Sequence, residues 1–246
     1  MRIEVCTYTL QSAINAEIAG AYRVELCDNI LEGGTTPSFG MIELTRKYIS
    51  IKLNVIIRPR GGDFLYSGLE FETMLKDIHT VKKLGVDGIA VGVLSADGSV
   101  DKAGMKEIIS LAKPLSVTFH RAFDCVEDPF GSLDTLMELG VERVLTSGLK
   151  KSALEGKEMI AWLVEYAAGR IIIMPGGGIN YLNIKDIVKI TKAREYHLSG
   201  KSVCNSQMVF RNNEVKFNSQ SAISEYDYIE SDVGKIKSVV DLVNKF

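Results

Sequence analysis

The hydrophobic and polar positions along the chain follow two alternating patterns. Short runs rich in valine, isoleucine and leucine, several with an apolar residue at every second position, indicate β-strands. Longer stretches between them carry apolar residues three or four positions apart and often stop at a glycine, which indicates α-helices. These patterns predict strands at residues 3–7, 23–27, 52–58 and 88–93, from residue 117, and at 143–146, 171–174 and 195–199. Helices are predicted at residues 10–20, 39–48, 71–84, 101–111, 128–140, 154–167, 184–190 and 232–243.

Strands and helices alternate in eight units of similar length. Such alternation implies a parallel sheet with right-handed crossover connections. The length of the chain suits a TIM-type (β/α)8 barrel, and we predict that residues 1–246 form this barrel as a single domain. An open, doubly wound sheet is the alternative, because periodicity does not show whether a sheet closes. Apolar residues at 208–210 and 215–217 flank the polar segment 211–214, which predicts a short hairpin inserted before the last helix.

Composition narrows the classes of partner. The formal net charge of −2 provides no basic field for nucleic acid or an anionic membrane surface. No apolar run approaches the roughly 20 residues that a membrane span needs. The chain enters a strand pattern directly at its start, so we expect no secretory signal. The four cysteines are scattered without a CxxC motif, and we therefore expect a reduced, cytoplasmic protein.

The alternation within the predicted strands separates an apolar face from a polar one. In the first three strands the polar face carries Glu4, Cys6, Glu25, Cys27, Arg58 and Arg60. In a barrel the apolar face packs on the helices and the other face points inward, where charges are costly unless they are paired or used. One interpretation is a working site at the carboxyl ends of the strands. The other is an internal ion-pair network of Glu4 and Glu25 with Arg58.

Several of these strands run into residues that suit catalysis or anion binding. The fifth strand is followed by His120, Arg121 and Asp124, and a histidine titrates near physiological pH. We predict Glu25, His120 and Asp124 as catalytic proton carriers. A glycine run follows the seventh strand, where it either supplies backbone donors to an anion or forms a tight turn. The residues predicted to bind the substrate or anion are Glu4, Arg58, Arg60, Arg121, Gly176, Gly177, Gly178, His197 and Ser199.

Two cysteines indicate a different chemistry. Cys6 and Cys27 lie near the ends of neighbouring strands with the same parity, so their thiols can approach each other. Soft thiolates favour Cu(I) or zinc, and a nearby glutamate or histidine shifts the preference toward zinc. We predict Cys6 and Cys27 as metal ligands, against the alternative that they are small, inert buried side chains.

Several segments, in order along the chain, resemble the copper homeostasis protein CutC family. They are residues 23–27 with 33–38, 57–64, 118–124, 145–148 and 174–179. The resemblance covers nearly the whole chain, and one departure is Leu149, where the family pattern has a glycine. It implies a TIM-barrel-like fold, a cytoplasmic location, a homo-oligomer such as a dimer or tetramer, and a role in copper handling.

Two functions follow as hypotheses, and the sequence leaves open whether the protein is an enzyme. In the first, a cytoplasmic protein of copper homeostasis binds Cu(I) through Cys6 and Cys27. In the second, a TIM-barrel enzyme of unidentified reaction acts on a small anionic or phosphorylated metabolite at the C-terminal mouth of the barrel. A barrel that serves only as a scaffold leaves the many interior charges unexplained.

Overall fold

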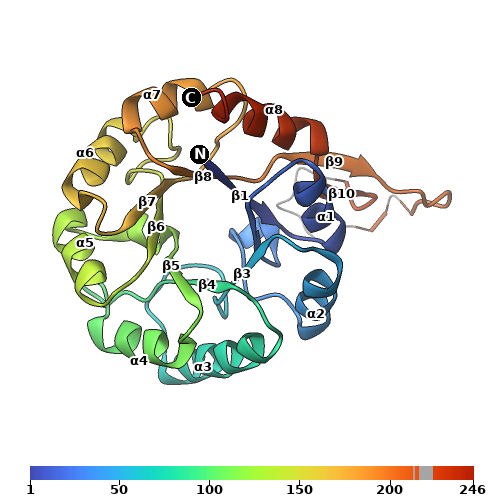
Figure 1. Ribbon diagram of the computed structural model, residues 1–246. Coiled ribbons are helices and arrows are strands. Elements are labelled where there is room, and N and C mark those ends of the chain that lie inside the picture. Colours follow the sequence, from blue (N-terminus) through green and yellow to red (C-terminus); the bar gives the residue numbers. More distant parts are fainter. Residues whose placement is uncertain (213, 216–223) are drawn as a thin grey trace.

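A computed structural model describes residues 1–212, 214–215 and 224–246. Eight parallel strands surround a common axis in a nearly closed barrel, which confirms the predicted fold class (Figure 1). Their order is β8-β1-β2-β3-β4-β5-β6-β7, so that each strand from β1 to β6 pairs with the next one along the chain, and β8 pairs with β1. The strands are β1 Arg2–Thr7, β2 Arg23–Leu26, β3 Lys52–Ile56, β4 Gly88–Val91, β5 Ser116–Phe119, β6 Arg143–Thr146, β7 Ile172–Pro175 and β8 Glu195–Leu198.

Helices cover the outer face of the barrel (Figure 1). They are α1 Leu10–Ile18, α2 Phe39–Tyr48, α3 Gly68–Lys83, α4 Lys102–Ala112, α5 Pro129–Glu138, α6 Lys157–Ala167, α7 Ile184–Thr191 and α8 Val233–Val243. Short 3-10 turns, η1 Ile30–Glu32 and η2 Arg121–Cys125, follow β2 and β5. Polar caps determine where several helices begin. Asp128 caps α5 ahead of Pro129, as the sequence predicts, and Ser67 forms a capping box with Glu70 at the start of α3.

The main hydrophobic core lies between the barrel and this ring of helices. Val5, Val24 and Leu53 are register partners on successive strands, and all three are fully buried on the outward face. Residues one position away on the same strands point into the barrel. The period-2 alternation of the sequence therefore separates core residues from interior residues in these strands, as predicted.

The amino-terminal half of the barrel interior holds a network of buried ion pairs. Arg23 pairs with Glu4 and, at 2.8 Å, with Glu195, while Arg143 pairs with Glu195 at 2.6 Å. An internal ion-pair network, the alternative interpretation of the sequence, therefore exists for Glu4, but its cation is Arg23 and not Arg58. Arg23 lies directly beside Glu4 in the strand register, whereas Arg58 lies beyond the carboxyl end of β3.

One edge of the barrel lacks main-chain pairing. Within the described residues, no ladder joins β7 to β8, although these two strands lie side by side. Side chains connect the strands here. Glu195 of β8 binds both Arg23 of β2 and Arg143 of β6, so that one carboxylate links three strands through the interior.

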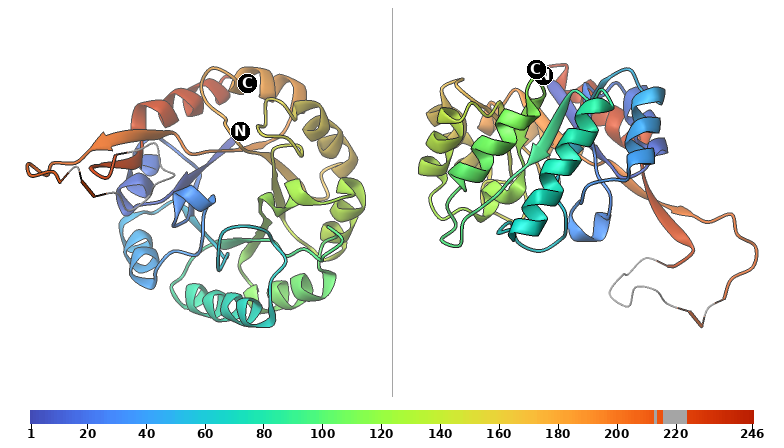
Figure 2. Two further views of the ribbon diagram at one scale, coloured as in Figure 1. Left: turned by 180° about the vertical axis from the view of Figure 1, so that it is seen from behind. Right: turned by 90° about the horizontal axis from the view of Figure 1, so that it is seen from below.

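A two-stranded antiparallel hairpin precedes α8, at a different position from the predicted one. Its strands are β9 Lys201–Asn205 and β10 Asp227–Ser231, and it projects from the barrel in Figure 2. Residues 208–210 form no strand, and Val209 is 99% exposed, so the apolar run there pairs with nothing among the described residues. The predicted second arm falls partly on residues 216–217, outside the described part of the chain. Asn15 on α1 anchors the base of the hairpin by donating to the Ser231 carbonyl.

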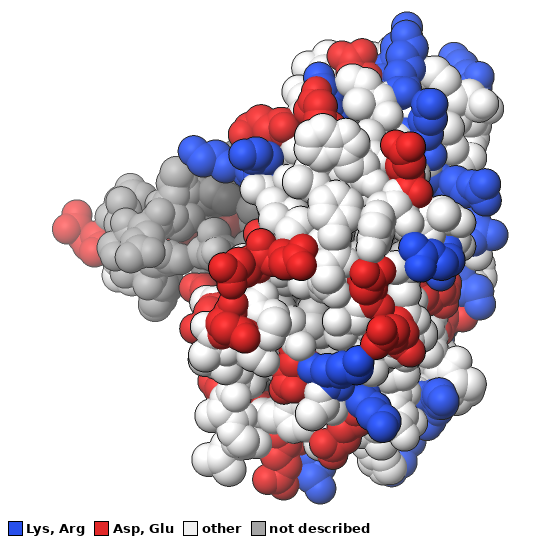
Figure 3. Space-filling view, turned by 90° about the vertical axis from the view of Figure 1, so that its left-hand side faces the viewer, with Lys and Arg blue, Asp and Glu red and all other residues white. Residues whose placement is uncertain are grey.

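Charges of both signs are spread over the face shown in Figure 3, around a strip of uncharged side chains. Among the described residues, no helix is both long and apolar enough to cross a membrane.

Candidate metal and ligand site at the barrel mouth

A cavity of about 480 Å³ opens at the carboxyl ends of the strands. Its walls come from strands β1, β2, β3, β6 and β8 and from the loops that follow β2, β3, β5, β7 and β8. Most of the sequence-predicted site residues line it, namely Cys6, Glu25, Arg58, His120, Arg121, Asp124, Gly177, Gly178, His197 and Ser199. Four other predicted residues, Glu4, Cys27, Arg60 and Gly176, lie outside this lining.

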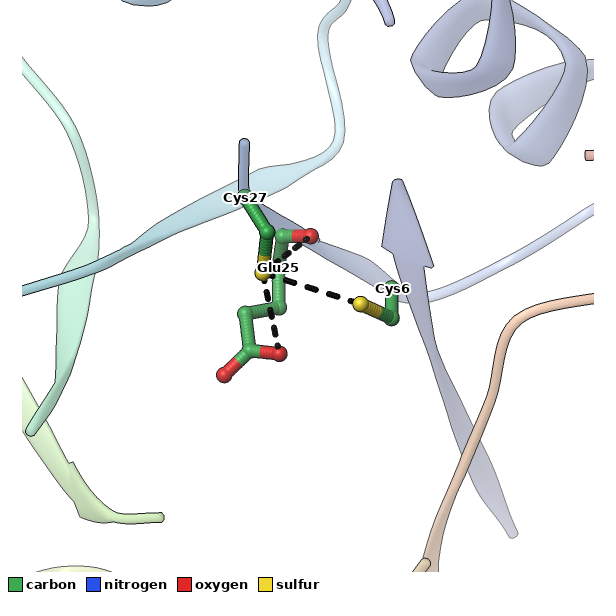
Figure 4. A group of neighbouring side chains, drawn as sticks. All are labelled: Cys6, Glu25 and Cys27. Atoms are coloured by element: carbon green, nitrogen blue, oxygen red, sulfur yellow. Dashed lines mark hydrogen bonds between the residues drawn. The ribbon is translucent and has the colours of Figure 1, made fainter. Parts of the chain in front are cut away.

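Two thiols meet at the carboxyl ends of β1 and β2. The Sγ atoms of Cys6 and Cys27 are 3.6 Å apart, and Glu25 Oε2 lies 3.5 Å from Cys27 Sγ (Figure 4). These three side chains are buried, and one ligand atom from each lies within 4.8 Å of the other two. The parity and strand order in the sequence therefore predicted the approach of the two cysteines correctly.

His197 connects the Cys6, Glu25 and Cys27 cluster to the buried ion pair of Glu4 with Arg23. Its Nδ1 lies 2.8 Å from Glu4 Oε1, and its Nε2 lies 3.8 Å from Glu25 Oε2. Burial lowers the pKa of His197, but contacts with Cys6, Glu4 and Glu25 outweigh this and raise the pKa well above its ordinary value. Burial likewise raises the pKa of Glu4, and the charge of Arg23 with the hydrogen bond to His197 brings it down to about 2. Glu4 is thus a carboxylate that stabilises an imidazolium.

The same surroundings give the two thiols different proton affinities. The hydrogen bond from Cys27 and the neighbouring His197 hold the pKa of Cys6 well below its ordinary value, against the effect of burial. Burial and the adjacent Cys6 raise the pKa of Cys27. Burial also raises the pKa of Glu25 to about 8, so that its carboxyl group is largely protonated at neutral pH. Deprotonation is therefore easier at Cys6, which lies beside His197, than at Cys27.

His120 forms another part of the cavity wall. It caps η2, where its Nδ1 accepts a hydrogen bond from the Ala122 N–H at 3.2 Å. Its ring lies 5.1 Å from the Phe64 ring, and an added Cβ at Gly92 would come within 2.8 Å of it. Burial and the charge of Arg58 lower the pKa of His120 to about 3. A neutral ring whose Nδ1 accepts must carry its proton on Nε2, which suits hydrogen-bond donation better than proton abstraction.

The two neighbouring arginines have different environments. Arg58 is buried, and its guanidinium donates to the carbonyl oxygens of Glu32, Gly34 and Gly62. Arg60 lies on the rim, where it binds Glu70 and Asp63. Strand parity placed both side chains inside the barrel. This holds for Arg58, which lines the cavity, and is wrong for Arg60, which lies four residues beyond the end of β3.

Asp124 organises the loop after β6. Its carboxylate accepts hydrogen bonds from the Thr146 hydroxyl, from the Ser147 N–H and hydroxyl, and from the Leu149 N–H. Arg121 also binds it, at 2.7 Å. Leu149 has a φ of 60°, a left-handed conformation that glycine adopts more easily and that accounts for a glycine in the family pattern. With its oxygens engaged in this way, Asp124 is better suited to fixing the loop than to carrying a proton.

The glycine run after β7 needs its glycines. Gly177 and Gly178 have φ values of 102° and 75°, and both line the cavity. A Cβ at Gly176 would come within 2.4 Å of Leu145 Cδ1. The tight-turn interpretation therefore accounts for these residues without an anion.

Three residues of the interior were missed in the sequence, namely Arg23, Arg143 and Glu195. Arg23 and Glu195 could have been found by counting back two positions from Glu25 and His197. Arg143 opens a four-residue strand that shows no clear alternation.

Comparisons with known proteins show the family to which the chain belongs. The CutC family profile matches residues 1–202. The chain belongs to the CutC family. It is 48% identical to a mouse protein named copper homeostasis protein cutC homolog. The 237 aligned residues cover 96% of this chain and 87% of the mouse protein. It is 48% identical over 239 residues to a family protein CutC of Parabacteroides distasonis, covering 97% and 98% of the two chains. A solved structure of a CutC protein from Streptococcus agalactiae matches with a TM-score of 0.78 and 35% identity, covering 81% of this chain and 98% of that one.

Proposed function

We propose that this CutC-family protein acts in copper homeostasis by binding one Cu(I) ion between Cys6 and Cys27. The observation that carries the proposal is the 3.6 Å approach of the two Sγ atoms beside an open cavity. Thiolates are the ligands that Cu(I) prefers in proteins. Reduced thiols are maintained in the cytoplasm, where we expect the protein to work.

The surroundings of the thiol pair support this proposal. Metal binding requires deprotonated ligands, and the lowered pKa of Cys6 favours the loss of its proton. The His197 imidazolium offsets the negative charge that two thiolates and a monovalent cation leave behind. Cys6 lines the cavity, which gives an ion a route to the sulfur. Glu25 adds an oxygen donor, which suits zinc better than Cu(I), so both ions belong in the test.

Calorimetric titration of the reduced, metal-free protein tests this proposal with buffered Cu(I) and, separately, with zinc. We expect one Cu(I) per chain in the wild type and none in the double variant Cys6→Ser/Cys27→Ser. The matched control replaces the other two cysteines, Cys125→Ser/Cys204→Ser, and should bind as the wild type does. Stoichiometric Cu(I) binding by the Cys6→Ser/Cys27→Ser variant would refute the proposal. If the wild type binds zinc more tightly than Cu(I), the site is a zinc site and the copper proposal is wrong.

A second candidate function is an enzyme that acts on a small anionic metabolite. The observation that favours it is the size of the cavity, because about 480 Å³ falls within the range of small-molecule pockets and far exceeds the space a metal ion needs. This candidate requires a recognition site for the anion. For either function we expect a dimer or tetramer, which sedimentation analysis of the purified protein measures.

A further inference from the structure

Two buried nitrogen atoms of the cavity-lining residues His120 and Arg58 have no hydrogen-bond partner among the residues that the structure describes. They are His120 Nε2 and Arg58 Nε. Both side chains are more than nine-tenths buried, with exposed fractions of 3% and 6%. Buried polar groups in proteins are nearly always hydrogen-bonded, so each such exception calls for a specific partner. Both residues line the same cavity and lie against the Phe64 ring, and two unpartnered donors in such an arrangement point to a ligand.

The surroundings of His120 determine both its tautomer and the orientation of its ring. Since Nδ1 accepts from the Ala122 N–H, the neutral ring presents Nε2–H as a donor. Phe64 lies against the ring, and the backbone at Gly92 leaves no room for a side chain beside it. The ring is therefore held in one orientation before any ligand arrives, and such preorganisation favours binding.

Arg58 contributes a positive charge that forms no ion pair within the described chain. Its Nη1 and Nη2 atoms are held by backbone carbonyl groups, and its guanidinium lies 5.1 Å from the Phe64 ring. None of the three acidic residues that line the cavity forms an ion pair with Arg58 in the described chain. Glu25 lies beside Cys27 and His197, and its Oε1 has no hydrogen-bond partner. Asp124 is saturated by hydrogen bonds and Arg121, and the Glu32 carboxylate packs against Gly61. A buried charge without a counter-ion is costly, and an anionic ligand would supply the missing charge.

We propose that Arg58 and the Nε2–H of His120 form a binding site for the carboxylate group of a small organic acid. The site provides one positive charge and a small number of free N–H donors, which match a monoanionic carboxylate better than a phosphate dianion. Apolar side chains of the same cavity, Ile30, Ile56, Phe64, Leu145, Ile179 and Leu198, would contact the rest of the acid. This inference deepens the second candidate function and does not depend on copper binding.

The test uses three probes on the full-length protein: butyrate, its neutral isostere butyramide, and inorganic phosphate. Binding is measured by calorimetry, and the His120 ring is observed by ¹⁵N–¹H NMR of histidine-labelled protein. We expect butyrate to bind and to shift the His120 Nε2–H resonance, with butyramide and phosphate at least about tenfold weaker, the loss typical of a hydrogen bond to a charged group. Tighter binding of phosphate or butyramide than of butyrate would overturn the assignment of a carboxylate.

The variant His120→Asn removes the Nε2 donor while an asparagine side chain can still accept the Ala122 N–H at the cap position. We expect it to bind butyrate at least about tenfold more weakly. The matched control His79→Asn, an exposed position on α3, should bind as the wild type does. Unchanged affinity in His120→Asn, or a wild-type Nε2–H resonance that butyrate does not move, would overturn the proposal. The NMR measurement decides the matter if the variant does not fold.

The copper proposal and the enzyme candidate are tested separately from this site. The double variant Cys6→Ser/Cys27→Ser should lose Cu(I) and keep butyrate binding. Loss of butyrate binding in that variant would show that the two sites are one, and would overturn the assignment of the carboxylate to Arg58 and His120. Turnover of organic acids by the wild type tests the enzyme candidate, and its absence leaves the butyrate result unaffected.

Discussion

The buried, neutral His120 should make the stability of this protein depend on pH in a way that one substitution removes. The pKa of His120 is lowered from 6.5 to about 3 in the folded protein by burial and by Arg58. Between these two pKa values, His120 is therefore protonated in the unfolded chain and neutral in the folded one. Stability from this group is complete above the unfolded pKa and is lost progressively as the pH falls from 6.5 toward the folded value of about 3. Between about pH 7 and about pH 5 the loss amounts to about 2 kcal/mol.

Urea unfolding of the wild type and of His120→Asn at these two pH values measures the effect. Asparagine does not titrate, so the difference in free energy of unfolding between the two proteins should shrink by about 2 kcal/mol at the lower pH. The difference between the wild type and His79→Asn provides the control for replacing a histidine. A gap between wild type and His120→Asn that stays constant with pH would refute the argument, because the ring would then protonate equally well in both states.

Two further substitutions test the geometry of the barrel. Gly92→Ala adds a methyl group 2.8 Å from the His120 ring, so we expect a loss of about 1–3 kcal/mol in urea unfolding and weaker butyrate binding. Wild-type values for both would show that the ring has room to move. Arg143→Met leaves the buried Glu195 with one interior cation fewer, and we expect a loss of about 3–5 kcal/mol by the same measurement. A loss below about 1 kcal/mol would show that Arg23 alone satisfies Glu195.

Much of the fold and part of the site could be predicted from the sequence, because strand parity and unit order are local patterns. Parity placed Cys6, Glu25 and Cys27 on one face, and the parallel order of strands brought the two thiols together. Parity holds only while the chain remains in a strand. It therefore misplaced Arg60, which lies four residues beyond the end of β3 on a turn that carries its side chain to the rim.

The ion-pair partners, the pKa of His120 and the position of the hairpin depend on contacts between distant parts of the chain. A local sequence pattern does not predict such contacts. The partner of Glu4 is Arg23 rather than Arg58 because strand register, not residue type, sets which charges meet. The neutral state of His120 follows from its burial beside Arg58, and the sequence offered only the ordinary pKa of a histidine. The hairpin was predicted where apolar residues cluster, yet that cluster stays exposed and the paired strands lie on either side of it.

The unpaired edge between β7 and β8 has a consequence for how the cavity can be entered. The eight strands form a strip that ends at β7 and β8, and across the gap Glu195 of β8 binds Arg143 of β6. Elsewhere around the barrel, widening the sheet would break main-chain hydrogen bonds between strands. At this edge the strands can separate slightly without breaking a ladder, and both Gly177 and His197 line the cavity there. We therefore expect the wall of the cavity to open most easily to an incoming ligand between β7 and β8.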